Sequence, residues 1–168
     1  MPESDPVVQA NEKDSLAGFL DFYRGVVERK LDRLSLTDAT RPLTPTGLSC
    51  LGIVRHLGWV EYSWFRHCFA GEDVVPPPRE EGDNAVQFRV GSDETVDSVL
   101  DFYKSESSHS RVVAAASDSL DALSARDNPS FGRVSLRWVL IHMVEETARH
   151  AGHLDVMREM IDGRTGYF

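Results

Sequence analysis

Residues 135–163 read SLRWVLIHMVEETARHAGHLDVMREMIDG, and this stretch decides the fold. Apolar side chains recur along it at steps of three and four residues, which is the spacing of one buried face on an α-helix. These positions are Leu136, Val139, Leu140, Met143, Leu154, Met157 and Ile161. Ser135 is a favourable residue at a helix start, and Gly163 is favourable just past a helix end. We therefore predict one long helix from Ser135 to Asp162, packed against other helices.

Three more segments have the same helical spacing, namely residues 14–34, 49–69 and 94–123. The first begins near Asp14 or Ser15 and the third follows Asp93, and these residues cap helices well. The second begins at about Ser49 and ends before Gly71. The candidate core positions of the first and third segments are Leu16, Phe19, Leu20, Tyr23, Val27, Leu31, Leu34, Val96, Val99, Leu100, Tyr103, Val112, Val113, Leu120 and Leu123. Four long helices without a convincing alternating strand predict an all-α fold, specifically a four-helix bundle.

The segments between these helices differ in character. Residues 1–12 carry prolines and polar side chains without periodicity, so we expect a flexible N-terminal arm before a single domain over residues 13–168. Residues 35–48 are rich in proline, glycine and hydroxyl side chains and predict a loop across the end of the bundle. Residues 70–93 include a triple proline that forbids a long helix, and they form a long excursion that is a candidate lid.

Charge and composition exclude several classes of function. The chain has 168 residues, of which 41% are hydrophobic and 27% charged, as is usual for a globular protein. A formal net charge of −9 would repel a phosphate backbone, so we expect no nucleic-acid partner. The N-terminus lacks the pattern of a signal peptide, and no apolar run approaches the roughly 20 residues of a membrane span. We therefore expect a cytoplasmic protein with no membrane association.

The two cysteines, Cys50 and Cys68, both fall in the segment 49–69. A helix that contains both would hold them about 27 Å apart at roughly 1.5 Å per residue. This separation excludes a disulfide between them. We expect two buried structural thiols rather than a redox pair.

The last helix also carries a polar stripe beside its apolar face. His142, Glu146 and His150 recur every four residues, and His153 follows three residues later. At about 100° per residue these side chains fall within an arc of roughly 80°, so they all face one place. Burying a carboxylate and imidazoles without partners costs several kcal/mol, and a bound cation is one partner that removes this cost. Glu146 and His150, one turn apart, can both reach one metal ion.

A third ligand has to come from a facing helix, and His56 qualifies because it shares a face with Ile53 and Val60. Two histidines and a glutamate leave coordination positions open for water or substrate, which is the pattern of catalytic zinc sites. Other interpretations stay open at this point. His56 could be a hydrogen-bonded core histidine, and Glu146 could be a surface acid paired with Arg149 or His142.

Two segments resemble a known family. RHLGWVEYSWF at residues 55–65 and HMVEETARHAGHLDVMREMIDG at residues 142–163 look like the two signature segments of the DinB-like superfamily, specifically its actinobacterial branch of uncharacterised proteins. In helix order and segment spacing the resemblance covers roughly residues 14–168. It implies a four-helix bundle with a long crossover connection, and a homodimer.

The resemblance also implies a ligand set. Many members of the superfamily bind a metal through one histidine on the second helix and a His-x-x-x-His pair on the last helix. Here Glu146 occupies the earlier position of the pair, and in this the chain resembles the mycothiol-dependent maleylpyruvate isomerases, whose zinc is bound by His, Glu and His. By that similarity the metal ligands are His56, Glu146 and His150. His142 and His153 are then the candidate catalytic residues, for acid–base chemistry or for support of the ligands.

The activity implied by the resemblance is a metal-dependent S-transfer or isomerisation on a small-molecule substrate, with a low-molecular-weight thiol such as mycothiol as cofactor. Zinc suits two histidines and a glutamate, although nickel, iron and manganese accept similar ligands. Two other functions remain open from the residues alone. One is a non-catalytic metal or small-ligand binding module, and the other is a metal-free structural dimer whose histidine stripe is satisfied by hydrogen bonds.

Overall fold

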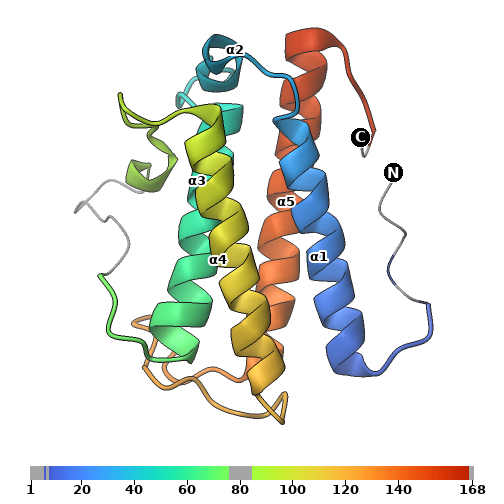
Figure 1. The fold of residues 1–168 in the computed structure, drawn as a ribbon, viewed down its shortest axis with the longest axis vertical. Helices are drawn as coiled ribbons and strands as arrows, with labels where there is room; N and C mark the ends of the chain where they lie inside the picture. Colours follow the sequence, from blue (N-terminus) through green and yellow to red (C-terminus); the bar gives the residue numbers. More distant parts are fainter. Residues whose placement is uncertain (1–5, 7, 76–84, 167–168) are drawn as a thin grey trace.

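The computed structural model describes residue 6 and residues 8–75 and 85–166. Its long helices are α1 (Glu12–Lys30), α3 (Cys50–Glu61) with its π-helical continuation η1 (Tyr62–Phe69), α4 (Val96–Ala116) and α5 (Leu136–Asp162). Two short elements are the helix α2 (Leu36–Thr40) and the 3₁₀ turn η2 (Val86–Phe88). The long helices form a four-helix bundle (Figure 1), and the described residues contain no β-strand. The prediction of an all-α bundle is therefore confirmed.

The four long helices form two parallel pairs that run in opposite directions (Figure 1). α1 packs along α5, and Glu12 at the start of α1 accepts a hydrogen bond at 2.8 Å from Arg137 at the start of α5. α3 packs along α4, and Arg55 reaches Glu94 just before α4. Parallel neighbours need a connection that returns along the bundle, and the chain between η1 and α4 supplies this long crossover. The triple proline and the rest of residues 76–84, in the middle of the candidate lid, lie outside the described residues.

Local capping signals predicted several helix ends correctly. The hydroxyls of Ser49 and Ser135 accept backbone hydrogen bonds at the starts of α3 and α5, and Gly163 ends α5 with φ +75°. α1 begins slightly earlier than predicted, because Asn11 caps it through a hydrogen bond from a backbone N–H. It ends at Lys30 rather than near residue 34.

The predicted third helix is shorter than expected at both ends. It begins after Thr95, whose hydroxyl accepts the N–H of Ser98, and Asp93 does not cap it. It ends at Ala116 rather than at residue 123, because the following serines form a turn in which the hydroxyl of Ser119 accepts the N–H of Asp121 at 3.1 Å. Serine hydroxyls that bond to nearby backbone groups compete with the helical pattern in this way.

The residues after α4 form a loop that hydrogen-bonds to the start of α5. The carbonyl groups of Leu120 and Ala122 accept hydrogen bonds of 2.9 Å from the N–H groups of Arg137 and Leu136. The first turn of a helix has N–H groups without partners inside the helix, so this loop satisfies two of them. The expected loop over residues 35–48 also contains an unpredicted helix, α2, which is capped by the hydroxyl of Ser35.

The apolar core consists of two clusters. The cluster nearer α2 comprises Val26, Val27, Leu31, Ala39, Cys50, Leu51, Ile53, Val54, Leu57, Val99, Tyr103, Ala151, Leu154 and Met157. The cluster nearer the α4–α5 loop comprises Leu20, Val60, Phe65, Cys68, Ala114, Val134, Leu136, Val139, Leu140 and Met143. Three predicted core residues, Phe19, Val112 and Leu123, are instead exposed. Each belongs to a helical pattern that drifts off the buried face or continues past the true end of the helix.

A buried ion pair joins α1 to the end of α3. Arg24 donates from Nε to Oε1 of Glu61 at 2.7 Å and from Nη2 to Oε2 at 2.6 Å. Both side chains are buried, and Tyr103 is fully buried close to them. Two parallel hydrogen bonds in this fork geometry satisfy both carboxylate oxygens. The pair is therefore a closed structural contact.

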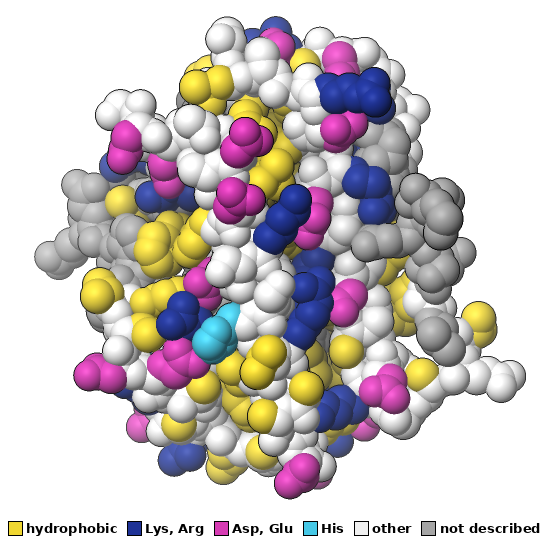
Figure 2. Space-filling view, viewed as in Figure 1, with side chains coloured by type: hydrophobic (Ala, Val, Ile, Leu, Met, Phe, Trp, Pro, Cys, Tyr) yellow, Lys and Arg dark blue, Asp and Glu magenta, His cyan; other side chains and the backbone are white. Residues whose placement is uncertain are grey.

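The outer face of α1 and α4 carries many charged side chains. Figure 2 shows acidic and basic side chains interspersed over this face. One such contact is the hydrogen bond of 2.9 Å from Arg111 to Asp21, between two exposed side chains. No helix in the described part of the chain is long and apolar enough to cross a membrane.

Candidate metal centre

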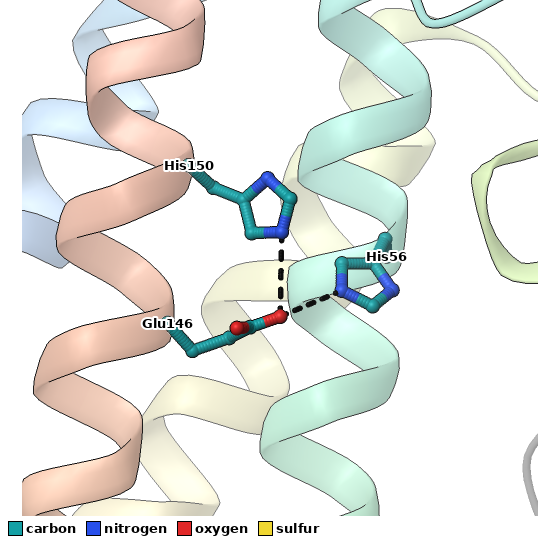
Figure 3. Close-up of side chains that lie close together, drawn as sticks. All are labelled: His56, Glu146 and His150. Atoms are coloured by element: carbon teal, nitrogen blue, oxygen red, sulfur yellow. Dashed lines mark hydrogen bonds and ion pairs between the residues drawn. The ribbon is translucent and has the colours of Figure 1, made fainter. Parts of the chain in front are cut away.

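His56, Glu146 and His150 point toward one another across the boundary between α3 and α5 (Figure 3). Oε1 of Glu146 lies 3.1 Å from Nε2 of His56 and 3.3 Å from Nε2 of His150. One nitrogen or oxygen from each residue lies within 4.8 Å of the others, so the three could hold a metal ion. The structure thus brings together the three residues that the sequence proposed as ligands.

Helical geometry explains this convergence. Glu146 and His150 are one turn apart on α5 and therefore project to the same side. His56 lies opposite them on α3, between helical turns whose apolar residues enter the core. The three side chains are 12%, 16% and 8% exposed, so the cluster is mostly shielded but still reachable from solvent. A closed structural site would not need this access.

Glu146 is held as a carboxylate. Hydrogen bonds from His150 and His56 keep the pKa of Glu146 far below its ordinary value, and they outweigh the opposing effect of burial. His142, one turn earlier, pairs instead with Glu145 at 3.5 Å. The interpretation of Glu146 as a surface acid paired with His142 is therefore wrong, and its charge faces the two imidazoles.

His153 contacts the cluster from the next turn of α5. Its Nδ1 lies 3.3 Å from Nδ1 of His150. Burial, together with the nearby His150 and Arg149, lowers the pKa of His153. Without a metal, Nε2–H of His150 donates to Glu146. With a cation in place of that hydrogen bond, the ring could carry its proton on Nδ1 and donate it to a neutral His153, which would leave Nε2 as a lone-pair donor. This arrangement fits the ligand role of Nε2.

His142, the other candidate catalytic residue, lies in an aromatic cluster. Its ring stacks on Trp138 with centroids 5.1 Å apart and meets Trp64 edge-on at 4.9 Å. Phe131 extends the cluster, with its ring centroid 5.0 Å from that of Trp138. The structure therefore places His142 one turn from Glu146, among aromatic rings and outside the cluster of three.

The crossover supplies a residue that the sequence did not predict. The ring of Phe88 in η2 stacks on His56, with centroids 4.0 Å apart and an interplanar angle of 18°, and its centroid is 5.8 Å from that of His150. Nδ1 of His56 is buried without a hydrogen-bond partner among the described residues. Packing by Phe88 therefore orients the His56 ring, in place of the hydrogen bond that usually fixes a ligating histidine.

Gly52 allows the crossover to approach this closely. A Cβ at Gly52, one turn before His56, would lie 2.3 Å from the carbonyl oxygen of Phe88. Arg55 secures the same segment by donating to the carbonyl of Gln87 at 2.9 Å. A glycine inside an otherwise apolar helix was the available signal, because it often marks a close approach of another backbone.

This combination of features defines an all-α protein of the DinB-like kind, with a candidate His/Glu/His metal centre between two helices. Residues 15–163 match the family model described as mycothiol S-transferase, and the chain belongs to that family. The match covers all four long helices except the start of α1. The family indicates transferase chemistry related to mycothiol, on a small-molecule substrate. No curated protein sequence matches the chain.

Proposed function

We propose that this protein is a metal-dependent mycothiol S-transferase, with His56, Glu146 and His150 as the metal ligands. The observation that carries the proposal is the convergence of three ligand atoms within 4.8 Å of one another from α3 and α5. Two imidazoles and one carboxylate form the protein part of many catalytic zinc sites and leave positions open. Zinc is the proposed metal, and nickel, iron and manganese are the alternatives that the same ligands accept.

A divalent cation at this centre would lower the pKa of a thiol bound to it, so that the thiol reacts as a thiolate near neutral pH. The chain's own thiols are poorly suited to that task. Burial raises the pKa of Cys50 to about 11 and also raises the pKa of Cys68. This supports a nucleophile that comes from a separate thiol molecule, as the family description implies.

The two other histidines of α5, His142 and His153, receive different roles in the proposal. His153 can orient His150 through the contact between their Nδ1 atoms, and its lowered pKa keeps it unprotonated. It can accept a proton from an incoming thiol only when its single lone pair leaves this contact. His142 lies with Trp64 and Trp138, where an apolar part of the second substrate could contact the rings. We therefore propose His153 as a positioning residue and candidate base, and His142 as a substrate-side acid–base candidate.

Metal content of the purified, untagged chain tests the centre directly. Plasma mass spectrometry should find about one equivalent of a transition metal per chain, and His56→Ala, Glu146→Ala and His150→Ala should each lose it. Glu145→Ala and His109→Ala are matched controls, because Glu145 is exposed and His109 pairs with Glu72 elsewhere. A native chain that binds neither zinc nor nickel would refute the metal centre and favour the metal-free structural dimer.

The transfer reaction needs its own assay. The metal-loaded chain should conjugate mycothiol to a small aromatic electrophile, the metal-free chain should not, and zinc should restore the activity. A chain that binds metal but transfers neither mycothiol nor other small thiols would instead be the non-catalytic binding module. The homodimer is a separate proposal, which light scattering of the purified chain would test.

A further inference from the structure

A cavity lies on the opposite side of the bundle from the candidate metal centre. It has a volume of about 360 Å³ and opens between α1 and α4, on the face shown in Figure 2. Its floor reaches the interior, because Phe65 of η1 and Leu140 of α5 line it. This volume is at the lower end of the range of sites for small molecules, which is about 300–1,000 Å³.

The sequence explains why the helices leave this space. α1 packs mainly on α5, and α4 packs mainly on α3. In the half of the bundle nearer the α4–α5 loop, the facing positions are small, with Ala17 on α1 and Ser110 and Ala114 on α4. Side chains of this size do not fill the gap between two helices, whereas protein interiors are normally close-packed. The small side chains at these positions therefore account for the cavity.

The lining combines an apolar floor with one unsatisfied polar group. Leu20, Phe65 and Leu140 are at most 1% exposed and belong to the apolar core. The hydroxyl of Ser110, a residue only 1% exposed, has no hydrogen-bond partner among the described residues. A buried hydroxyl without a partner is costly, so a ligand that supplies one is favoured. Arg24 also lines the cavity, but Glu61 and Asp21 already accept its hydrogen bonds.

Two contacts span the mouth of the cavity, and one of them joins exposed side chains. Lys13 of α1 donates to the carbonyl of Ser117 at 2.7 Å, and Arg111 of α4 donates to Asp21 at 2.9 Å. Both residues line the cavity, and both contacts join α1 to α4. The Arg111–Asp21 ion pair joins exposed side chains and therefore contributes little to stability, whereas the Lys13 hydrogen bond is partly buried. Opening the Arg111–Asp21 pair would give a small molecule a route into the space below.

We propose that this cavity is a binding site for a small, neutral, mainly apolar molecule with one hydroxyl or carbonyl group, which hydrogen-bonds to Ser110 while its apolar part packs on Leu20, Phe65 and Leu140. The charged rim is balanced by its own ion pairs, so it gives no reason to select a charged ligand. The site is separate from the candidate metal centre and does not depend on the proposed transferase activity.

The probe pair 4-propylphenol and propylbenzene tests the proposal, because the two differ only in the hydroxyl group. In the native chain, 4-propylphenol should shift the methyl NMR signals of Leu20 and Leu140 and raise the melting temperature with probe concentration. Ser110→Ala should lower the affinity for 4-propylphenol by about threefold to tenfold, which corresponds to one neutral hydrogen bond. The affinity for propylbenzene should stay unchanged. Equal loss for both probes would overturn the role of Ser110.

Blocking variants test the location. Ala17→Leu and Ala114→Leu fill the cavity from its two walls and should abolish probe binding, whereas Ala116→Leu on the exposed end of α4 should not. Two variants on different helices keep the test valid if one of them fails to fold. His150→Ala should bind the probe like the native chain. Unchanged binding in both blocking variants, or probe shifts at α3 and α5 residues of the metal centre instead, would overturn the proposal.

Discussion

Glu61 and Glu146 have opposite surroundings in this bundle. Glu61 is fully buried, and Arg24 occupies both of its oxygens. Glu146 is 16% exposed, and its two contacts are imidazole nitrogens that share a single oxygen. The first carboxylate is neutralised within the protein, whereas the second has two neighbours that are themselves able to bind a cation. The difference shows that a buried acid indicates a ligand site only when its partners are also potential ligands.

The largest expected effect is a loss of stability when Arg24 is removed from its buried ion pair with Glu61. Arg24→Met leaves the carboxylate of Glu61 buried and unpaired, so the free energy of unfolding should fall by about 3–5 kcal/mol in urea denaturation. The double variant Arg24→Met, Glu61→Leu should recover most of this loss, because it removes both charges. Arg111→Met, which breaks an exposed pair, is the control. A loss for Arg24→Met no greater than for this control would show that the buried pair is not important for stability.

The corresponding change at Glu146 should affect binding instead. Glu146→Gln should lower the affinity for zinc by about 100-fold or more, because one of the three proposed protein ligands loses its charge. The metal-free variant should stay within about 1 kcal/mol of the native chain in unfolding free energy, since the amide oxygen can still accept hydrogen bonds. Competition with a zinc chelator gives the affinity. Equal zinc binding by both chains would contradict the proposed ligand role.

A smaller effect on zinc affinity is expected at His153, which contacts a proposed ligand but is not one itself. His153→Phe removes the group that contacts Nδ1 of His150 and should lower the affinity for zinc by about 10-fold to 100-fold. His153→Gln retains an acceptor and should recover part of the affinity. The same chelator competition measures both variants. If Phe and Gln behaved alike, the contact between the two histidines would have no role in orienting the ligand.

The smallest effect is a pH dependence of the metal-free chain. The pKa of Glu146 is lowered by hydrogen bonds from His150 and His56, so these contacts stabilise the fold above the carboxylate's ordinary pKa of 4.5. That contribution is lost as the pH falls below this value, because the unfolded chain takes up the proton first. Glu146→Gln should therefore lose less stability on acidification than the native chain. Urea midpoints on both sides of pH 4.5 measure the difference, and Glu145→Gln is the control.

Features set by neighbouring residues were predictable from the sequence. The caps at Ser49, Ser135 and Gly163 act within one helical turn, and the shared face of Glu146 and His150 follows from the helical repeat. The end of α4 was missed because a serine turn and a helix compete closely there, and the apolar pattern continues through Leu120 into the loop.

Features set by contacts between distant segments were not predictable in the same way. His56 was proposed from its residue type on a facing helix, and only the bundle brings it to Glu146, 90 residues away. Phe88 lies in a polar segment whose position over α3 depends on the path of the crossover. The pairing of Arg24 with Glu61 likewise depends on which helices become neighbours. Sequence periodicity gives the faces of helices, but it does not give the partner of each face.

The separation of 90 residues between His56 and Glu146 has a consequence for folding. The unfolded chain does not hold these groups together, so a cation that binds the trio binds the native state alone. Its binding energy then adds to the stability of the whole bundle, by about 2.7 kcal/mol when the free metal is 100 times its dissociation constant. Because a long loop must close before this contact exists, we expect it to form late in folding. Metal should consequently slow unfolding of the chain more than it speeds folding.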